Sequence, residues 1–156
     1  MNDIIKKELD KWLTGERDFI MNASNFAAIL FNNLPDANWV GFYMLSEGDL
    51  ILGPFQGKPA RRRIAIGEGV CGYTAAKKES VIVPNVSVFE GHIVCDCVSQ
   101  SEICIPLMKD GVFFGLLDID SPQLDMFTEE DKNILETFVE LLINSSDMDK
   151  IKNYYK

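Results

Sequence analysis

One short segment, FEGHIVCDCVSQSE at residues 89–102, holds two of the four cysteines and the only histidine of this 156-residue chain. Residues of these types serve as metal ligands or as reactive thiols. His92, Cys95 and Cys97 lack the spacing of a zinc site, because Cys-x-Cys departs from the usual Cys-x-x-Cys pattern. We therefore expect no metal in this segment. A thiolate at Cys95 would need a stabilising partner, since the charge of Asp96 disfavours it.

The other two cysteines, Cys71 and Cys104, stand in apolar surroundings. Cys71 lies in GVCG at residues 69–72, near the expected start of a helix, where the helix dipole would lower the pKa of its thiol. Cys104 stands two residues after Glu102 and would share its face of a strand. Both cysteines also fit the role of a small buried hydrophobic residue.

Three carboxylates are expected at one end of a sheet. Asp118 and Asp120 in GLLDID are two residues apart, so they point to the same face of a strand. Glu102 begins the preceding strand and could join them. Three close carboxylates are costly unless one is protonated or they bind a cation such as an amino group. The alternative is a strand end whose carboxylates reach water.

Two aromatic residues, Trp39 and Tyr43, are four apart in WVGFY and share a strand face, with Gly41 between them. They fit the wall of a ligand pocket. They also fit ordinary core packing, which is the commoner role of buried aromatic side chains.

Helices are expected at both ends of the chain, with strands between them. Apolar residues recur at helical spacing over 4–13 and 19–30, and the second run ends before Pro35. A last helix begins after the N-cap Thr128, and the polar tail from about residue 145 is expected to fray. The middle of the chain predicts strands over 39–45, 50–52, 61–66, 81–83, 102–108 and 112–120, a short helix over 70–78 and a long polar loop over 84–101.

This order of elements predicts one α+β domain over residues 1–156. A mostly antiparallel central sheet would carry the N- and C-terminal helices on one face. The other face is left to loops, and a ligand pocket would lie under the longest of them, 84–101, because loops of that length are usually functional. Such a loop could also close over the pocket as a lid.

The composition narrows the class of partner. The net charge of −9 repels phosphate backbones and anionic membranes, so neither nucleic acid nor a membrane surface is expected as a partner. We see no signal peptide and no apolar run long enough for a membrane span. The chain is expected to be cytoplasmic, where its cysteines rest as thiols.

Six segments resemble the free methionine-(R)-sulfoxide reductases, small stand-alone enzymes of the GAF fold. GAF sensor domains in general do not share the combination of GHIxCD, SEI and LDIDSP. The matching segments run in order from residue 39: WVGFY at 39–43, LGPFQG at 52–57, GEGVCG at 67–72, GHIVCD at 91–96, SEICIPL at 101–107 and GLLDIDSP at 115–122.

The resemblance implies reduction of free L-methionine-(R)-sulfoxide to methionine, with electrons from thioredoxin and no metal or organic cofactor. A protonated carboxylate such as Glu102 would activate the sulfoxide oxygen, and the Cys95 thiolate would attack sulfur and become a sulfenic acid. The implied site residues are Cys95 as catalytic thiol, Cys71 as a second family cysteine, Glu102, Asp118 and Asp120 for the substrate, and Trp39 and Tyr43 around its methyl group.

One position departs from the family pattern. The remaining family cysteine normally follows Pro-Ala ten residues before Cys71, and here Arg61 stands in that place. We expect Cys71 to form the disulfide with oxidised Cys95. Cys97 is the second choice, since its ring with Cys95 is strained, and Cys104 is the third.

A competing hypothesis is a non-catalytic GAF module that binds a small ligand and has lost redox recycling with the cysteine replaced by Arg61. The intact set of Cys95 and the three carboxylates favours the enzyme. A homodimer is left open.

Overall fold

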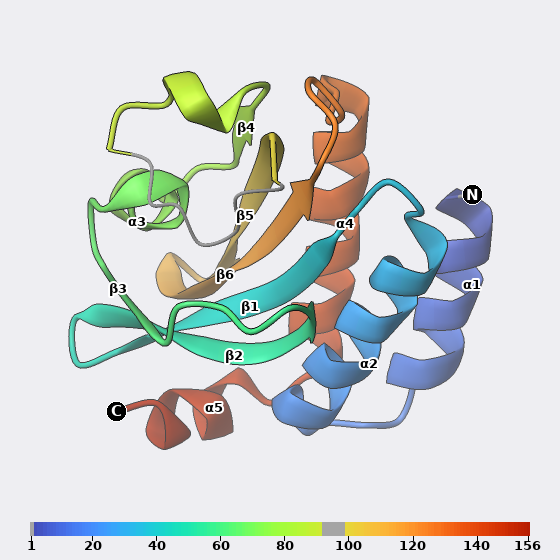
Figure 1. The fold of residues 1–156 in the computed structure, drawn as a ribbon. Helices are drawn as coiled ribbons and strands as arrows, with labels where there is room; N and C mark the ends of the chain where they lie inside the picture. The colour runs from blue at the N-terminus through green and yellow to red at the C-terminus, as the bar shows by residue number, and fades with distance from the viewer. Residues whose placement is uncertain (1, 92–98) are drawn as a thin grey trace.

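A computed structural model describes residues 2–91 and 99–156 (Figure 1). In this part of the chain the helices are α1 (Asn2–Leu13), α2 (Phe19–Asn33), α3 (Gly69–Lys77), α4 (Glu129–Ser145) and α5 (Met148–Tyr154), with a 3-10 turn η1 (Val86–Val88). The strands are β1 (Trp39–Ser46), β2 (Asp49–Gly57), β3 (Arg63–Ala65), β4 (Val81–Val83), β5 (Ser101–Lys109) and β6 (Val112–Ser121).

The strands form one sheet in the order β3-β2-β1-β6-β5-β4, and all neighbours are antiparallel. Two hairpins, β1–β2 and β5–β6, make its centre, and β1 joins them by pairing with β6. The expected α+β class and antiparallel sheet are therefore confirmed. The strand expected over 61–66 is shorter, because only residues 63–65 pair with β2.

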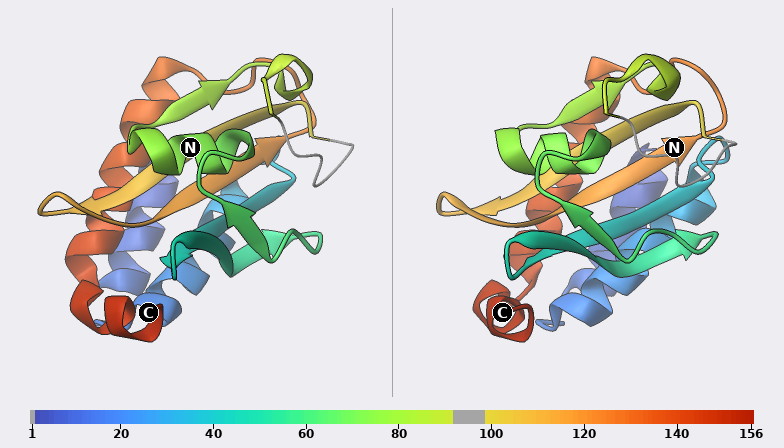
Figure 2. Two further views of the ribbon diagram at one scale, coloured as in Figure 1. Left: turned by 90° about the vertical axis from the view of Figure 1, so that its left-hand side faces the viewer. Right: turned by 60° about the vertical axis from the view of Figure 1, so that its left-hand side comes forward.

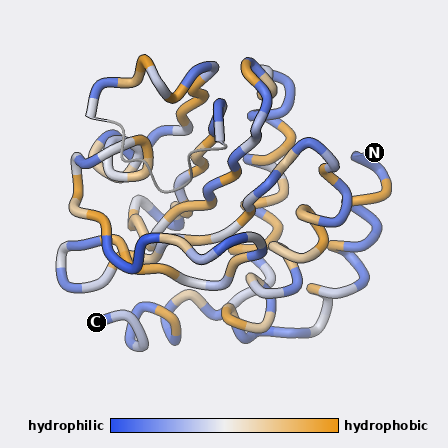
Figure 3. Tube along the Cα trace, viewed as in Figure 1, coloured by the Kyte–Doolittle hydropathy of each residue, from blue (hydrophilic) through white to orange (hydrophobic). Residues whose placement is uncertain are grey.

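Helices α2 and α4 pack on one face of the sheet, and α1 packs on both of these helices (Figures 1 and 2). Their apolar residues recur at helical spacing, which gives the alternation of colours along these helices in Figure 3. They bury the main core together with the side chains of β1, β5 and β6 that point to this face: Val40, Phe42, Met44, Ile103, Ile105, Leu107, Leu117 and Ile119. In the described part of the chain, no helix is long and apolar enough to cross a membrane.

The opposite face carries more than the loops that we expected, since α3 packs there on β5 and β6 (Figure 2). Gly72 allows α3 to lie close to the end of β3, because a Cβ atom there would lie 2.6 Å from the carbonyl oxygen of Ala65. A second, smaller core forms between α3 and the sheet, and it includes Trp39, Tyr43 and Cys104. Strand alternation thus separates the side chains of the main core from those of the second core on the opposite face.

The C-terminal tail differs from the sequence prediction. Residues after 145 do not fray as expected but form α5, whose N-cap Asp147 accepts a hydrogen bond from the backbone N–H of Lys150. Met148 and Ile151 are buried in the main core. Two apolar residues at helical spacing were enough to order a segment that is otherwise polar. The start of α4 is as predicted, with Thr128 and Asp131 forming a capping box.

We predict that Gly41→Ala displaces Trp39. An alanine Cβ at this position would lie 2.5 Å from Cη2 of Trp39 and closer still to Cβ of Phe55. Overpacking of this kind costs about 1–3 kcal/mol of unfolding free energy. Trp12 is 52 % exposed, so a Trp12→Phe background leaves Trp39 as the reporter. Urea unfolding should show the loss, and the tryptophan emission should shift to the red.

Gly15→Ala is the control, because Gly15 has a φ of +85° but open space around its Cβ position. It should lose stability through backbone strain alone and leave the Trp39 emission unchanged. If Gly41→Ala leaves both the tryptophan emission and the stability unchanged, the Trp39 ring does not lie over Gly41.

Candidate active site

A cavity opens between α3 and the face of the sheet opposite α1, α2 and α4. Its volume is about 50 Å³, room for a few water-sized groups. The side chains that we selected from the sequence on three strands and one helix all line it: Trp39, Tyr43, Cys71, Glu102, Asp118 and Asp120.

The carboxylates meet because of the strand register. Glu102 of β5 lies opposite Asp120 of β6, and Cys104 lies opposite Asp118. All four side chains point away from the helical layer, since their neighbours Ile103 and Ile119 lie in the main core. Glu102 and Asp118 are 6 % and 5 % exposed. The alternative of a solvated strand end is therefore wrong for these two residues.

Burial and crowding alter the proton affinity of Glu102. Burial raises its pKa well above its usual value, and the nearby charges of Asp118 and Asp120 raise it further. Glu102 therefore keeps a proton at a pH where an exposed glutamate has lost it. The cluster can offer one protonated carboxyl group beside carboxylates that attract a cation.

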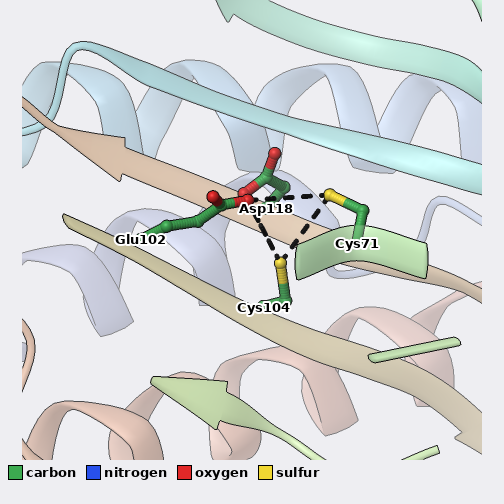
Figure 4. A group of neighbouring side chains, drawn as sticks. All are labelled: Cys71, Glu102, Cys104 and Asp118. Carbon is green, nitrogen blue, oxygen red and sulfur yellow. Dashed lines mark hydrogen bonds between the residues drawn. The ribbon is translucent and has the colours of Figure 1, made fainter. Parts of the chain in front are cut away.

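Two thiols pack against these carboxylates (Figure 4). The sulfur of Cys71 lies 3.8 Å from that of Cys104 and 3.7 Å from Oε1 of Glu102. The Cys104 thiol lies 3.6 Å from the same oxygen and 3.5 Å from Oδ1 of Asp118. Both cysteines are buried and free of disulfide bonds.

The expected low pKa of Cys71 is wrong. Cys71 does lie in the first turn of α3, but its contact with Cys104, its burial and the charge of Asp118 raise the pKa of its thiol well above the usual value. Burial likewise raises the pKa of Cys104 to about 11. A helix N-terminus contributes less here than desolvation and the neighbouring acids do.

Trp39 and Tyr43 form one wall of the cavity. Their rings stack with centroids 6.0 Å apart, and Trp39 also stacks on Phe55 at 5.3 Å. The indole N–H of Trp39 donates to the carbonyl of Lys58, and the hydroxyl of Tyr43 donates to the carbonyl of Arg61. Both hydrogen bonds go to the segment at 58–61, and the two rings belong to the second core as well as to the lining of the cavity.

The segment at 58–61 borders the cavity through Lys58, Pro59 and Ala60. Arg61 holds the place where the family pattern has a cysteine, and it is exposed. It contributes the carbonyl oxygen that accepts from Tyr43. Its contact with the aromatic wall thus uses backbone and leaves the side chain out.

Several expectations lie outside the described residues. These are His92, Cys95, Cys97 and the central part of the 84–101 loop. The ends of that segment are described: η1 covers residues 86–88, and Ser99 lines the cavity. Ser99, two residues before the start of β5, therefore lies at the cavity.

Sequence reasoning missed part of the constellation. Cys104 was ranked only as a third disulfide partner, although its register opposite Asp118 brings it between the acids and Cys71. Phe55 was not selected either. The pairing of Gly41 with Phe55 puts its ring beside Trp39. Its place in the second half of the 39–57 hairpin was the available signal, because cross-strand partners on one face touch.

The arrangement can hold a small molecule that has both a cationic and an apolar end. The acids supply negative charge and one proton, and the stacked aromatic rings supply a flat apolar surface. Aromatic faces attract positively charged or sulfur-bearing groups. An adjacent thiol would make such a site suitable for reaction at sulfur.

Comparison with known proteins agrees with these features. Residues 11–145 match the GAF domain family. The chain is 42 % identical to the free methionine-R-sulfoxide reductase of Escherichia coli over 135 residues, which are 86 % of this chain and 82 % of that protein.

Two solved structures show the same fold at similar identity. The reduced form of fRMsr of Staphylococcus aureus has a TM-score of 0.89 and 43 % identity, covering 92 % of this chain and 94 % of the other. The free methionine-R-sulfoxide reductase of Neisseria meningitidis, in complex with its substrate, has a TM-score of 0.86 and 36 % identity, covering 92 % and 89 %. The chain therefore belongs to the GAF-domain family and, within it, to the free methionine-R-sulfoxide reductases.

Proposed function

We propose that this protein reduces free L-methionine-(R)-sulfoxide to L-methionine, with Cys95 as the nucleophile. The observation that carries the proposal is the buried meeting of Glu102, Asp118 and the aromatic wall in one cavity. The residue that begins β5 lies only six positions after Cys95 along the chain. Membership of the reductase family supports the same reaction.

Glu102 acts as the general acid in this proposal. A sulfoxide oxygen leaves poorly until it is protonated, and the raised pKa of Glu102 keeps a proton available for it. The Cys95 thiolate attacks the substrate sulfur, the protonated oxygen is transferred to the cysteine sulfur, and methionine leaves. Cys95 remains as a sulfenic acid.

The remaining carboxylates provide selectivity for the free amino acid. Asp118 and Asp120 lie where they can pair with the ammonium group of the substrate, because both line the cavity beside Glu102. A methionine sulfoxide within a peptide lacks that charge. Trp39 and Tyr43 supply the surface for the methyl group, since a polarised S-methyl group is attracted to an aromatic face.

Recycling requires a second thiol. We assign this role to Cys71, because it lines the cavity while the Cys104 sulfur lies behind it. Condensation of the Cys71 thiol with the sulfenic acid releases water and forms a disulfide, which an external dithiol such as thioredoxin reduces. The proposal includes no metal or organic cofactor in the reaction, and the cytoplasm as the compartment in which these thiols rest reduced.

The activity is tested with thioredoxin, thioredoxin reductase, NADPH and each epimer of free and peptide-bound methionine sulfoxide. NADPH should be consumed with the free R epimer alone. Cys95→Ser should reduce consumption to the level of buffer, because the nucleophile is lost. Cys97→Ser is the matched control and should retain turnover. If the wild type reduces neither epimer, even when a small dithiol replaces thioredoxin, the result would favour the non-catalytic ligand-binding module.

The disulfide partner is tested by a single turnover followed by alkylation and mass spectrometry. The wild type and Cys97→Ala should contain a Cys71–Cys95 disulfide. Cys71→Ala should form one equivalent of methionine and then recycle poorly with thioredoxin, because its sulfenic acid has lost the proposed partner and a ring with Cys97 is strained. A Cys95–Cys97 disulfide in the wild type would contradict the assignment.

The raised pKa of Glu102 predicts how stability depends on pH. The folded chain binds this proton more tightly than the unfolded chain, whose glutamate titrates near the usual 4.5. The free energy of unfolding should therefore fall as pH rises above about 4.5, by at most about 1.4 kcal/mol per pH unit. Glu102→Gln removes this loss. Urea titrations of both proteins at a series of pH values measure the difference.

The variant Glu102→Gln also distinguishes a role of Glu102 as general acid from a purely structural role. Glu102→Gln should fold at least as well as the wild type at neutral pH and yet lose about 10²–10⁴-fold in kcat, since an amide donates no proton to the leaving oxygen. A stability difference that does not change with pH would argue against a protonated Glu102.

A further inference from the structure

We propose that Cys71, Cys104, Glu102 and Asp118 form a binding site for Zn²⁺, and that zinc in this site switches the reductase off. Cys104 is the key residue, because the proposed reaction gives it no part. Zinc binding stands on the geometry of the four side chains alone. Only the inhibition rests on the proposed function.

The spacing of the donor atoms favours a zinc ion between them (Figure 4). Zinc binds four ligands as a tetrahedron, with Zn–S bonds of about 2.3 Å and Zn–O bonds of about 2.0–2.2 Å. The edges of that tetrahedron are then about 3.8 Å between two sulfurs and about 3.5 Å between sulfur and oxygen. The Cys71–Cys104 sulfur distance is 3.8 Å.

Three sulfur–oxygen distances also agree with the edges of a zinc tetrahedron. Glu102 Oε1 lies 3.7 Å from the sulfur of Cys71 and 3.6 Å from that of Cys104, and Asp118 Oδ1 lies 3.5 Å from Cys104. All four ligand atoms lie within 4.8 Å of one another. Four of the six edges thus match a zinc tetrahedron, and the two that join Asp118 to Cys71 and to Glu102 are at most 4.8 Å, so Asp118 would move inward to complete it.

The four side chains are also buried, and Glu102 has no ion-pair partner among the described residues. The four residues are at most 6 % exposed. Within the parts of the chain that the structure describes, no lysine or arginine forms an ion pair with Glu102. Its Oε1 faces the thiols of Cys71 and Cys104. A dipositive ion that replaces the two thiol protons would leave the net charge of the pocket unchanged and would lie between donor atoms that otherwise repel one another.

The donor set selects the metal. Two thiolates and two carboxylates in tetrahedral positions suit zinc, whereas Mg²⁺ and Ca²⁺ prefer oxygen ligands and higher coordination numbers. The ligands come from three rigid elements: Cys71 from α3, Glu102 and Cys104 from β5, and Asp118 from β6. Cys71, Glu102 and Asp118 also line the cavity, which gives the ion a path of entry.

Zinc and substrate would exclude each other. The ion takes Glu102, the proposed acid, and Cys71, the proposed disulfide partner. It also takes Asp118, which pairs with the substrate ammonium group in the proposed function. Filling the site therefore removes three requirements of the reaction at once, while Cys104 supplies the fourth ligand.

The test begins with binding. The reduced, metal-free protein is dialysed against buffered Zn²⁺ and its zinc content is measured by atomic absorption, and Co²⁺ is added in parallel. We expect one equivalent of zinc, and with Co²⁺ the thiolate charge-transfer and tetrahedral d–d bands. Cys95→Ser/Cys97→Ser should bind equally, because the loop thiols are not ligands. No zinc retained by the wild type overturns the proposal.

Cys104→Val and Cys104→Ser are the decisive variants. Each should weaken zinc binding by more than about 100-fold, because even the outer hydrogen-bond partners of metal ligands contribute about 10–100-fold. Circular dichroism verifies that the variants fold, and the serine variant keeps the size of the side chain. Zinc affinity equal to that of the wild type in a folded Cys104 variant overturns the site.

Inhibition is measured separately with free methionine sulfoxide. Zinc should inhibit the wild type competitively, and Cys104→Ser should keep its turnover and resist zinc. Zinc that binds through Cys104 without inhibiting would overturn the switch. If the wild type lacks reductase activity, the proposed function and the switch fail together, and the dialysis result still decides the zinc site.

Discussion

The antiparallel register of β1, β5 and β6 is the constraint on which the rest of the site depends. Each strand directs alternate side chains to opposite faces, so the apolar core and the reactive cavity use the same strands. Ile103 and Ile119 anchor the register in the core. Glu102 and Asp118 must then meet on the other side. A shift by one residue would exchange the two faces and place the acids in the helical core.

Crowding is the second consequence of that register. Carboxylates and thiols that would be ionised or solvated on a surface are buried together between α3 and the sheet. Each negative charge makes the next less favourable, so protons or a cation must occupy the space between them. The proposed proton donation, the proposed attraction of an ammonium group and the proposed zinc site all rest on this single electrostatic condition.

The sequence predicted most of the fold because its signals are local. The helices at 4–13 and 19–30, the hairpin turns and the Thr128 cap are set by spacing and by capping within a few residues. Strand alternation also predicted that Glu102 would join the two aspartates. It could not predict the high pKa of Cys71, because that depends on Cys104, which lies 33 residues away. Nor did polar composition reveal α5, which two buried side chains hold in place.

The hydrogen bond from Tyr43 to the carbonyl of Arg61 has a consequence for how such enzymes can change. The pocket wall uses only the backbone at position 61, so the side chain there is free to vary without reshaping the cavity. A cysteine at this position could be gained or lost by a single substitution while the binding surface stays intact. The hydrogen bond that holds Tyr43 therefore does not depend on which side chain stands at position 61, since every residue supplies the same carbonyl oxygen.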